Sequence, residues 1–366
     1  MVLWPLTRSA PSVHPDGGSM AKRTISKLEE LASLTGFSLA TVSRALSDHP
    51  SVKEQTKLRI WSTARDYNFP TYRYQSSRSS KSEGVIAAII PRLPMRAAML
   101  TDPFMQALVA NIGEAARERN CSLQISYSAP SSEEEFGLLI RSVRADGLVF
   151  IGQGLIHESL QRLADRRQDF VVWGAQMPGQ RYVTIGSDNL SGGRRITRHL
   201  LRLNRRKLLF LGDVAGPEMH ERYRGFVLAH EEEGVPTDAS RLISTHLDIG
   251  LASGTIERLV RERVDFDGIV AVNDVVALGA IQGLRRHGIN VPEDVSVVGY
   301  DNVDFSKYTQ PSLTTISQDC VRGGQLIVSK LIDRRNQHFV SEVLPLDLII
   351  RESCGTVDVS ARSSAS

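Results

Sequence analysis

Polar side chains stand directly after three apolar segments in the second half of the chain. Asn273 and Asp274 follow GIVAV, Asp301 follows VSVVGY, and Gln318 follows LTTIS. In open α/β sheets ligands bind beyond the carboxyl ends of the strands, so these side chains are candidates for a binding site. Carboxylate and amide groups accept and donate hydrogen bonds to vicinal hydroxyls. The pattern therefore favours a small polyol or sugar as ligand.

Each of these residues has a plainer structural alternative. Asp274 is expected to cap the helix that begins with it, which leaves Asn273 to face the ligand. Asp301 has the alternative of beginning a turn. Arg222, which lies in HERYRGF after the strand KLLFLG, is on position alone typical of a surface residue.

No catalytic or metal-binding motif accompanies these candidates. The chain lacks GxxxxGK[ST], HExxH and GxSxG, and its nine histidines show no metal spacing, so no catalytic residue, metal or cofactor is predicted. The three cysteines are far apart and form no CxxC, which argues against a disulfide framework and favours a reducing cytoplasm. Because the apolar runs are shorter than the ~20 residues that span a bilayer, no membrane partner is predicted.

The elements that would position the polar candidates alternate between apolar strands and helices from residue 84 onward. This alternation predicts an α/β fold with parallel, doubly wound sheets. About 270 residues exceed one comfortable sheet, so we expect two Rossmann-like lobes with a cleft between them over residues 83–351, followed by a polar tail at 352–366. The expected strands are 84–90, 122–127, 147–151, 169–173, 207–212, 267–273 and 294–300, and the expected helices are 104–119, 191–203, 222–233, 252–263, 274–287 and 320–334.

Residues 20–70 have a different pattern, that of three short helices. The turn Thr35-Gly36-Phe37 separates 26–34 from 38–46 at the spacing of a helix-turn-helix, whose second helix can enter a DNA major groove. Capping boxes are expected to begin at Ser26 and Ser51, and Ser38 is expected to cap the second helix. Residues 20–82 carry eleven Lys/Arg against five Asp/Glu, which suits a polyanion as partner. Residues 1–19 are interpreted as an extension before the true first residue, Met20.

The second helix of this motif supplies the expected DNA contacts. Arg44 can pair with a guanine edge through two hydrogen bonds, which is worth ~1–3 kcal/mol of discrimination. Leu39 and Ala40 can only contact thymine methyl groups or permit close approach. Ser38, Thr41 and Ser43 are candidates for phosphate or base contacts, with capping and solvent exposure as the alternative.

The segments LEELASLTGFSLATVSRAL, SVKEQTKLRI and YNFP resemble the DNA-binding headpiece of the lactose-repressor/galactose-repressor family of bacterial transcription factors. The resemblance implies a core like that of periplasmic sugar-binding proteins, with three chain crossings between the lobes. It also implies an effector site, to which the motifs RxxG, VxND, VVGYD and LTTIxQD contribute Arg222, Asn273, Asp301 and Gln318. Phe104 resembles an aromatic residue that lines the cleft, and Trp173 offers a second ring. The first lobe departs from the sugar-binding pattern, with Ile151 and Gly174 where polar residues are common.

Residues 71–82, TYRYQSSRSSKS, are interpreted as a hinge or linker. The resemblance implies a hinge helix whose Leu enters the minor groove, but the matching residue is Ser77. Tyr72 or Tyr74 then replaces that wedge, or Arg73 and Arg78 read the groove potential instead. The alternative is a flexible tether.

These observations predict a repressor-type transcriptional regulator that binds double-stranded operator DNA as a homodimer or a larger assembly of dimers. A sugar-like ligand in the cleft would control operator affinity, as inducer or as corepressor. The alternatives are a solute-binding protein or an enzyme built on the same α/β core.

Overall fold

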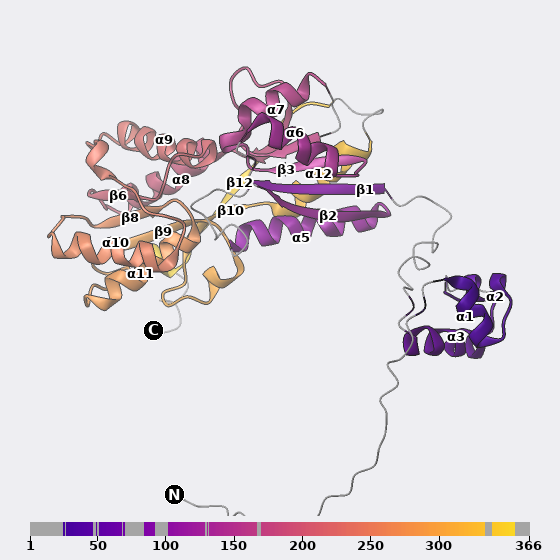
Figure 1. The fold of residues 1–366 in the computed structure, drawn as a ribbon. Coiled ribbons are helices and arrows are strands. Elements are labelled where there is room, and N and C mark those ends of the chain that lie inside the picture. The colour runs from indigo at the N-terminus through magenta and orange to yellow at the C-terminus, as the bar shows by residue number, and fades with distance from the viewer. Residues whose placement is uncertain are drawn as a thin grey trace, which may run out of the picture. The chain divides into compact units, whose positions relative to one another are not determined.

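The computed structural model describes residues 25, 27–46, 49, 51–67, 69, 84–91, 102–128, 130, 132–166, 170–333 and 339–355. The hinge candidates at 72–78 and the extension at 1–19 lie outside this set. Contacts divide the chain into two units, Met1–Ser82 and Glu83–Ser366, and we describe each by itself (Figure 1). None of the helices within the described ranges is long and apolar enough to cross a membrane.

The N-terminal unit contains the three expected helices, α1 (Leu28–Thr35), α2 (Leu39–Leu46) and α3 (Glu54–Asp66). They enclose one small apolar core, to which each helix contributes buried side chains. The indole Nε1 of Trp61 in α3 donates to the carbonyl of Ala45 in α2 at 3.2 Å. Gly36 ends α1 with a φ of 73°, a left-handed conformation that favours glycine. The helix-turn-helix prediction is thus confirmed.

The helix starts in this unit differ in part from the predicted capping boxes. Both boxes are wrong, because α1 starts after Lys27, whose backbone N–H donates to Glu30 Oε2 at 3.4 Å, and α3 starts only at Glu54. The Ser51 hydroxyl instead lies 2.8 Å from His49 Nδ1. The predicted cap at Ser38 is confirmed, since its Oγ accepts from the Thr41 N–H at 3.2 Å.

Two six-stranded sheets form the second unit, one in each lobe, which confirms the predicted fold class. In the first lobe the strand order is β11-β5-β4-β3-β1-β2 and in the second β12-β10-β9-β8-β6-β7. The strand pairs are parallel except for β10 with β12. The first-lobe strands are β1 (Gly84–Pro91), β2 (Cys121–Ser128), β3 (Gly147–Ile151), β4 (Phe170–Trp173), β5 (Val183–Ser187) and β11 (Glu342–Leu344). The second-lobe strands are β6 (Leu208–Leu211), β7 (Leu242–Ile243), β8 (Gly268–Ala271), β9 (Ser296–Asp301), β10 (Thr314–Gln318) and β12 (Leu346–Ile349).

Helices cover both faces of each sheet, as a doubly wound fold requires. The first lobe carries α5 (Pro103–Glu118), α6 (Glu133–Ser142), α7 (His157–Ala164) and α12 (Cys320–Ile332). The second carries α8 (Asn189–Arg202) and α9 (Pro217–Glu232) on one face, with α10 (Ile249–Arg261) and α11 (Asp274–Arg286) on the other (Figure 1). The chain passes between the lobes from β5 to α8, from β10 to α12 and from β11 to β12. These are the three crossings that the family resemblance implies.

The segment after β9 joins the apolar packing of the first lobe. Val303, which is 7% exposed, belongs to the same buried cluster as Phe104 and Trp173 of the first lobe. Phe305 packs against this cluster from the same segment. The carboxyl end of a central second-lobe strand is therefore held against the first lobe, and Asp301 lies at that end.

Candidate functional site

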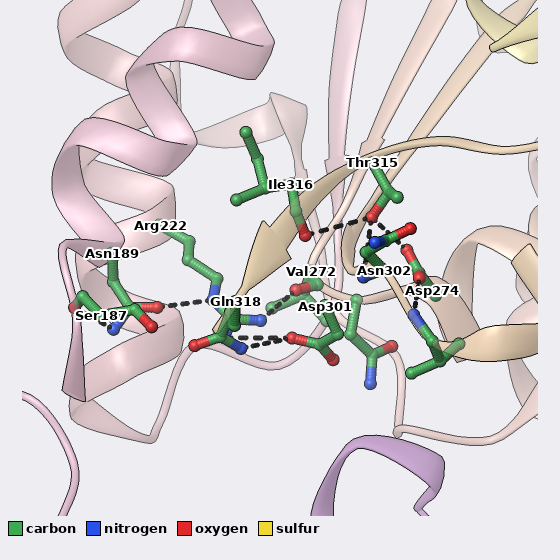
Figure 2. A network of polar contacts seen from close by, with 12 residues as sticks. Ser187, Asn189, Arg222, Val272, Asp274, Asp301, Asn302, Thr315, Ile316 and Gln318 are labelled. Carbon is green, nitrogen blue, oxygen red and sulfur yellow. Dashed lines mark hydrogen bonds and ion pairs between the residues drawn. The ribbon is translucent and has the colours of Figure 1, made fainter. Parts of the chain in front are cut away.

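A buried polar network gathers the predicted residues Arg222, Asp301 and Gln318 (Figure 2). Nε of Arg222 donates to Asn189 Oδ1 at 2.9 Å, and Nη1 donates to the carbonyl of Val272 at 2.7 Å. Its Nη2 lies 3.5 Å from Asp301 Oδ1. Three sides of the guanidinium are thus already occupied by protein acceptors, whose positions fix its plane.

Arg222 owes its place to the close packing of α8 against α9. A Cβ added at Gly193 of α8 would lie 2.1 Å from the Arg222 carbonyl oxygen, so a side chain there would force the helices apart. The guanidinium also stacks on Tyr300, with Cζ 3.6 Å from the ring centroid, a cation–π contact. Because α9 begins at Pro217 and not at Arg222 as predicted, Arg222 lies in its second turn and points into the network.

Asp301 is the last residue of β9 and is held in a strained conformation. Its φ of 110° is unusual for a residue with a side chain, and such strain costs about 1–3 kcal/mol where the surroundings impose it. Gln318 Nε2 donates to Asp301 Oδ1 at 2.7 Å. The following residue, Asn302, is fixed by Arg351, whose Nη2 donates to Asn302 Oδ1 at 2.7 Å. Several contacts therefore fix where the Asp301 carboxylate lies.

The helix cap that was expected at Asp274 is supplied by Asn273. Asn273 is the N-cap of α11, since its Oδ1 accepts from the Val276 N–H at 2.9 Å, and the prediction that Asp274 caps the helix was wrong. The reason is backbone geometry, because Asn273 has the extended conformation that a cap requires whereas Asp274 already belongs to the helix. Asp274 instead accepts from the Val303 N–H at 2.9 Å and from the Thr315 hydroxyl at 2.6 Å. It thus ties down the segment after Asp301.

Burial controls the protonation of both carboxyl groups. Desolvation raises the pKa of Asp301 well above its usual range, and Arg222 opposes this, while the charges of Asp102 and Asp274 add to it. Desolvation raises the pKa of Asp274 to about 7, against the hydrogen bonds from Thr315 and Val303. The network is therefore rich in acceptors, and a ligand that donates hydrogen bonds would stabilise its carboxylates.

The two aromatic candidates belong to the apolar core beside this network. Phe104 and Trp173 are 8% and 6% exposed, and their ring centroids lie 6.0 Å apart at an interplanar angle of 45°. Both rings pack in the cluster that includes Val303. Their main contacts are therefore with protein atoms, and a role against a ligand stays a prediction.

Two functional candidates escaped the sequence reasoning, Gln153 and Glu218. Gln153 is fully buried two residues after β3, and its Nε2 donates to the Ala175 carbonyl at 2.5 Å. Its Oε1 lies only 1.8 Å from the point where a side chain at Gly174 would begin. Gly174 thus lacks a polar side chain because Gln153 fills that space. The same strand-end rule that identified Asp301 could have identified Gln153.

On the N-terminal unit, α2 presents the predicted DNA-contacting side chains on its outer face. Ser38, Leu39, Ala40 and Arg44 are exposed, and Leu39 is 44% exposed despite its apolar side chain. Thr41 and Ser43 are half-buried, and the Thr41 and Ser38 hydroxyls lie 2.9 Å apart. Val42, Ala45 and Leu46 face the core instead. The arrangement leaves the first turn of α2 and Arg44 at the surface.

Comparison with known proteins agrees with this architecture in both units. Residues 27–71 match bacterial regulatory proteins of the lacI family, and residues 197–354 match a periplasmic binding protein-like domain. The chain belongs to the lacI family of bacterial regulatory proteins. The chain is therefore a DNA-binding transcriptional regulator, as predicted, and residues 27–71 carry the match to the DNA-binding part.

Individual members of the lacI family show the same similarity over most of the chain. The transcriptional repressor CytR of Escherichia coli K12 is 26% identical over 341 residues, which cover 91% of this chain and 97% of CytR. A lacI-family regulator from Enterococcus faecium with bound ribose is 25% identical, with a TM-score of 0.63 and 74% and 98% of the two chains covered. The lac repressor dimer bound to operator and an anti-inducer has the same fold, with 21% identity, a TM-score of 0.66 and coverage of 91% and 99%.

Proposed function

We propose that this lacI-family member is a repressor whose operator affinity is controlled by a neutral, hydroxyl-rich ligand, a sugar or sugar derivative, at Asp301. The observation that carries the proposal is the Arg222–Asp301–Gln318 network. It places a carboxylate, an amide and a guanidinium at the strand ends of the second lobe, beside the segment that packs on the first lobe. Ribose in the Enterococcus faecium relative supports this class of ligand.

The charge of the network favours a neutral ligand over a phosphate. Within the described network Arg222 is the cation beside Asp301, and its nitrogens already face Asn189, Val272 and Asp301. An incoming phosphate would be repelled by the Asp301 carboxylate, and the nearby Arg351 guanidinium is already hydrogen-bonded to Asn302, Ser306 and the Leu313 carbonyl. A hydroxyl group can instead donate to Asp301 and accept from Gln318.

A ligand at this place can change how the lobes sit against each other. Asp301 is fixed to the second lobe, while Val303, two residues later, is packed with Phe104 and Trp173 of the first. A ligand that binds one relative arrangement of the lobes more tightly shifts the population toward it. We infer that this shift reaches the DNA-binding unit through the hinge at 71–82.

Operator binding requires two copies of the chain. One small headpiece makes few contacts, whereas a dimer presents two recognition helices to two half-sites. The edge strand β2 supports a second copy, because Ile125 and Tyr127 are each 45% exposed on it, and exposed apolar side chains favour association.

A thermal-shift screen of the full chain tests the ligand class. We expect neutral sugars to raise the melting temperature, since a ligand at 100 times its Kd adds about 2.7 kcal/mol to the free energy of unfolding. Matched sugar phosphates should have less effect. Asp301→Ala should abolish the shift, and Asp304→Ala, whose exposed carboxylate pairs with Lys307, should retain it. Stabilisation by phosphates alone, or an unchanged response of Asp301→Ala, would contradict the proposal.

A further inference from the structure

A second polar cluster joins the two lobes through Glu218, in the first turn of α9. It lies beside Gln153, Gly174 and Ala175, which follow strands β3 and β4 of the first lobe. The Glu218 carboxylate interacts with the backbone amide of Ala175. Its Oε1 lies 3.1 Å from the point where a Cβ at Gly174 would be. Glu218 is therefore a second-lobe side chain that contacts the strand ends of the first lobe.

One acceptor in this cluster, Gln153 Oε1, lacks a hydrogen-bond donor among the described residues. Gln153 is fully buried, and within the described part of the chain its Oε1 has no hydrogen-bond partner. This oxygen and Glu218 Oε1 both crowd the space beside Gly174 Cα, at 1.8 and 3.1 Å from the same point. A buried acceptor without a donor loses the hydrogen bond that water would give it, and a charged carboxylate beside it adds repulsion. One proton on Glu218 would remove both penalties.

The orientation of the Gln153 amide is fixed by its other end. Nε2 donates to the Ala175 carbonyl at 2.5 Å, so exchanging the amide nitrogen and oxygen would place an oxygen against that carbonyl. Oε1 must therefore face the Glu218 side. Because this oxygen is sealed from solvent, a ligand cannot reach it as readily as a proton on the neighbouring carboxyl group.

We propose that Glu218 is a proton-dependent latch between the lobes: protonated, it donates a hydrogen bond to Gln153 Oε1, and the lobes in this arrangement hold one proton taken from solvent. Loss of that proton leaves two acceptors facing each other and weakens the contact. The latch makes lobe arrangement sensitive to pH. Its consequence for DNA binding rests on the proposed function, but its effect on the pH dependence of the stability of the core does not.

The groups around Glu218 are consistent with a retained proton. Desolvation raises the pKa of Glu218, and the opposing influences are Arg222 on the same helix and the amide of Ala175. Arg222 is itself committed to Asn189, Val272 and Asp301. From the first lobe, Tyr182 is within electrostatic reach of Glu218 and of Glu158, and its hydroxyl lies 2.7 Å from His157 Nδ1.

The sign of the pH dependence follows from the raised pKa. The folded arrangement binds a proton more tightly than the unfolded chain, so stability rises as pH falls. The contribution of Glu218 is complete below the ordinary carboxyl value of 4.5 and is lost as pH rises through its raised pKa. Glu218→Gln supplies a permanent donor, so it should keep the contact at every pH.

The test compares the full-length protein with Glu218→Gln, Glu218→Ala and Glu231→Gln, without ligand or DNA. Glu231 lies exposed on the same helix and serves as the matched control. Melting temperatures between pH 5 and 8 should decline with pH in the natural protein and in Glu231→Gln, and decline less in Glu218→Gln. Glu218→Ala should melt lower than Glu218→Gln at all pH values.

Infrared spectroscopy supplies a readout that a merely structural role would not move. Asp274 and Asp301 also have raised pKa values and contribute the same protonated-carboxyl signal in every variant, so the readout is a difference spectrum. At neutral pH, subtracting the spectrum of Glu218→Gln from that of the natural protein should leave a protonated-carboxyl band, and subtracting that of Glu231→Gln should leave none. Absence of the difference band for Glu218→Gln, equal pH slopes in all variants, or failure of Glu218→Gln to fold would each overturn the latch. If the pH dependence of Glu218 is observed but no sugar changes operator affinity, only the proposed function is refuted. If a sugar changes operator affinity but Glu218→Gln leaves the pH dependence unchanged, only the latch is refuted.

Discussion

Replacing Arg222 by methionine tests the ion pair at the centre of the polar network. Methionine keeps much of the length and apolar surface but removes every donor. Asp301 would lose its cation, and the Asn189 and Val272 oxygens would each lose a donor. Removing one partner of a buried ion pair costs about 3–5 kcal/mol. Because Asp301 has a raised pKa and can take up a proton, we expect the loss at the lower end of this range.

A double-mutant cycle separates the pair from the other losses. Asp301→Asn keeps an oxygen for Gln318 but removes the charge, so in its presence Arg222→Met should cost less than in the natural protein. We expect a coupling of about 0.5–3 kcal/mol, the range for residues in one network. Urea unfolding of the full chain, followed by circular dichroism at pH 7, measures the four free energies of unfolding.

The control for this cycle is Arg224→Met on the same helix. Arg224 is 53% exposed and pairs with Glu221 at 2.9 Å. Exposed pairs of this kind contribute about 0–1 kcal/mol, so the control should change stability little. The account of the network would be refuted if Arg222→Met cost no more than Arg224→Met, or if the effects of Arg222→Met and Asp301→Asn were additive.

Three further substitutions probe other parts of the molecule. Arg44→Ala should remove discrimination between selected and random DNA while leaving the fold intact, and unchanged selectivity in a gel-shift assay would exclude a base contact. Gly174→Ala should destabilise the core because its Cβ would collide with Gln153 Oε1, whereas Gly154→Ala has open space. The added mutation Gln153→Ala should relieve the collision in thermal denaturation. The raised pKa of Asp274 means that its contribution to stability is complete below the ordinary value of 3.8 and is lost as pH rises through about 7. Asp274→Asn should therefore show a smaller fall in melting temperature between pH 5 and 8, and an unchanged fall would contradict the assignment.

Local sequence patterns were sufficient to predict the helices of the headpiece and the longer helices and strands of the core. The turn at Gly36 and the apolar faces of three helices required no distant partner to be recognised. The elements that were missed depend on their neighbours. Strand β5, VTIGS, contains Gly and two hydroxyl residues, yet it is buried because it lies between β4 and β11. Helix α6 buries little beyond Phe136, so its apolar stripe was too narrow to be noticed.

Site residues that lie at the ends of strands could be predicted from the sequence. Site residues that are placed by the packing of one lobe on the other could not. Asp301 and Gln318 come directly after apolar segments, and in the structure Gln318 Nε2 donates to Asp301 Oδ1 at 2.7 Å. The cap at Asn273 depended on one residue of helix register, which periodicity does not resolve. The role proposed for Glu218 depends on Gln153, a residue in the other lobe, and a contact between such distant residues cannot be predicted from local sequence patterns.

The most direct test of the account is the operator affinity of the full-length protein with and without a neutral sugar identified by thermal shift. DNA sites selected from a random library would be labelled, and binding followed by fluorescence anisotropy at fixed salt. We expect the sugar to change the Kd at least tenfold in the natural protein and in Asp304→Ala, but not in Asp301→Ala. Equal affinities with and without a sugar that demonstrably binds would contradict the claim that this site controls the headpiece.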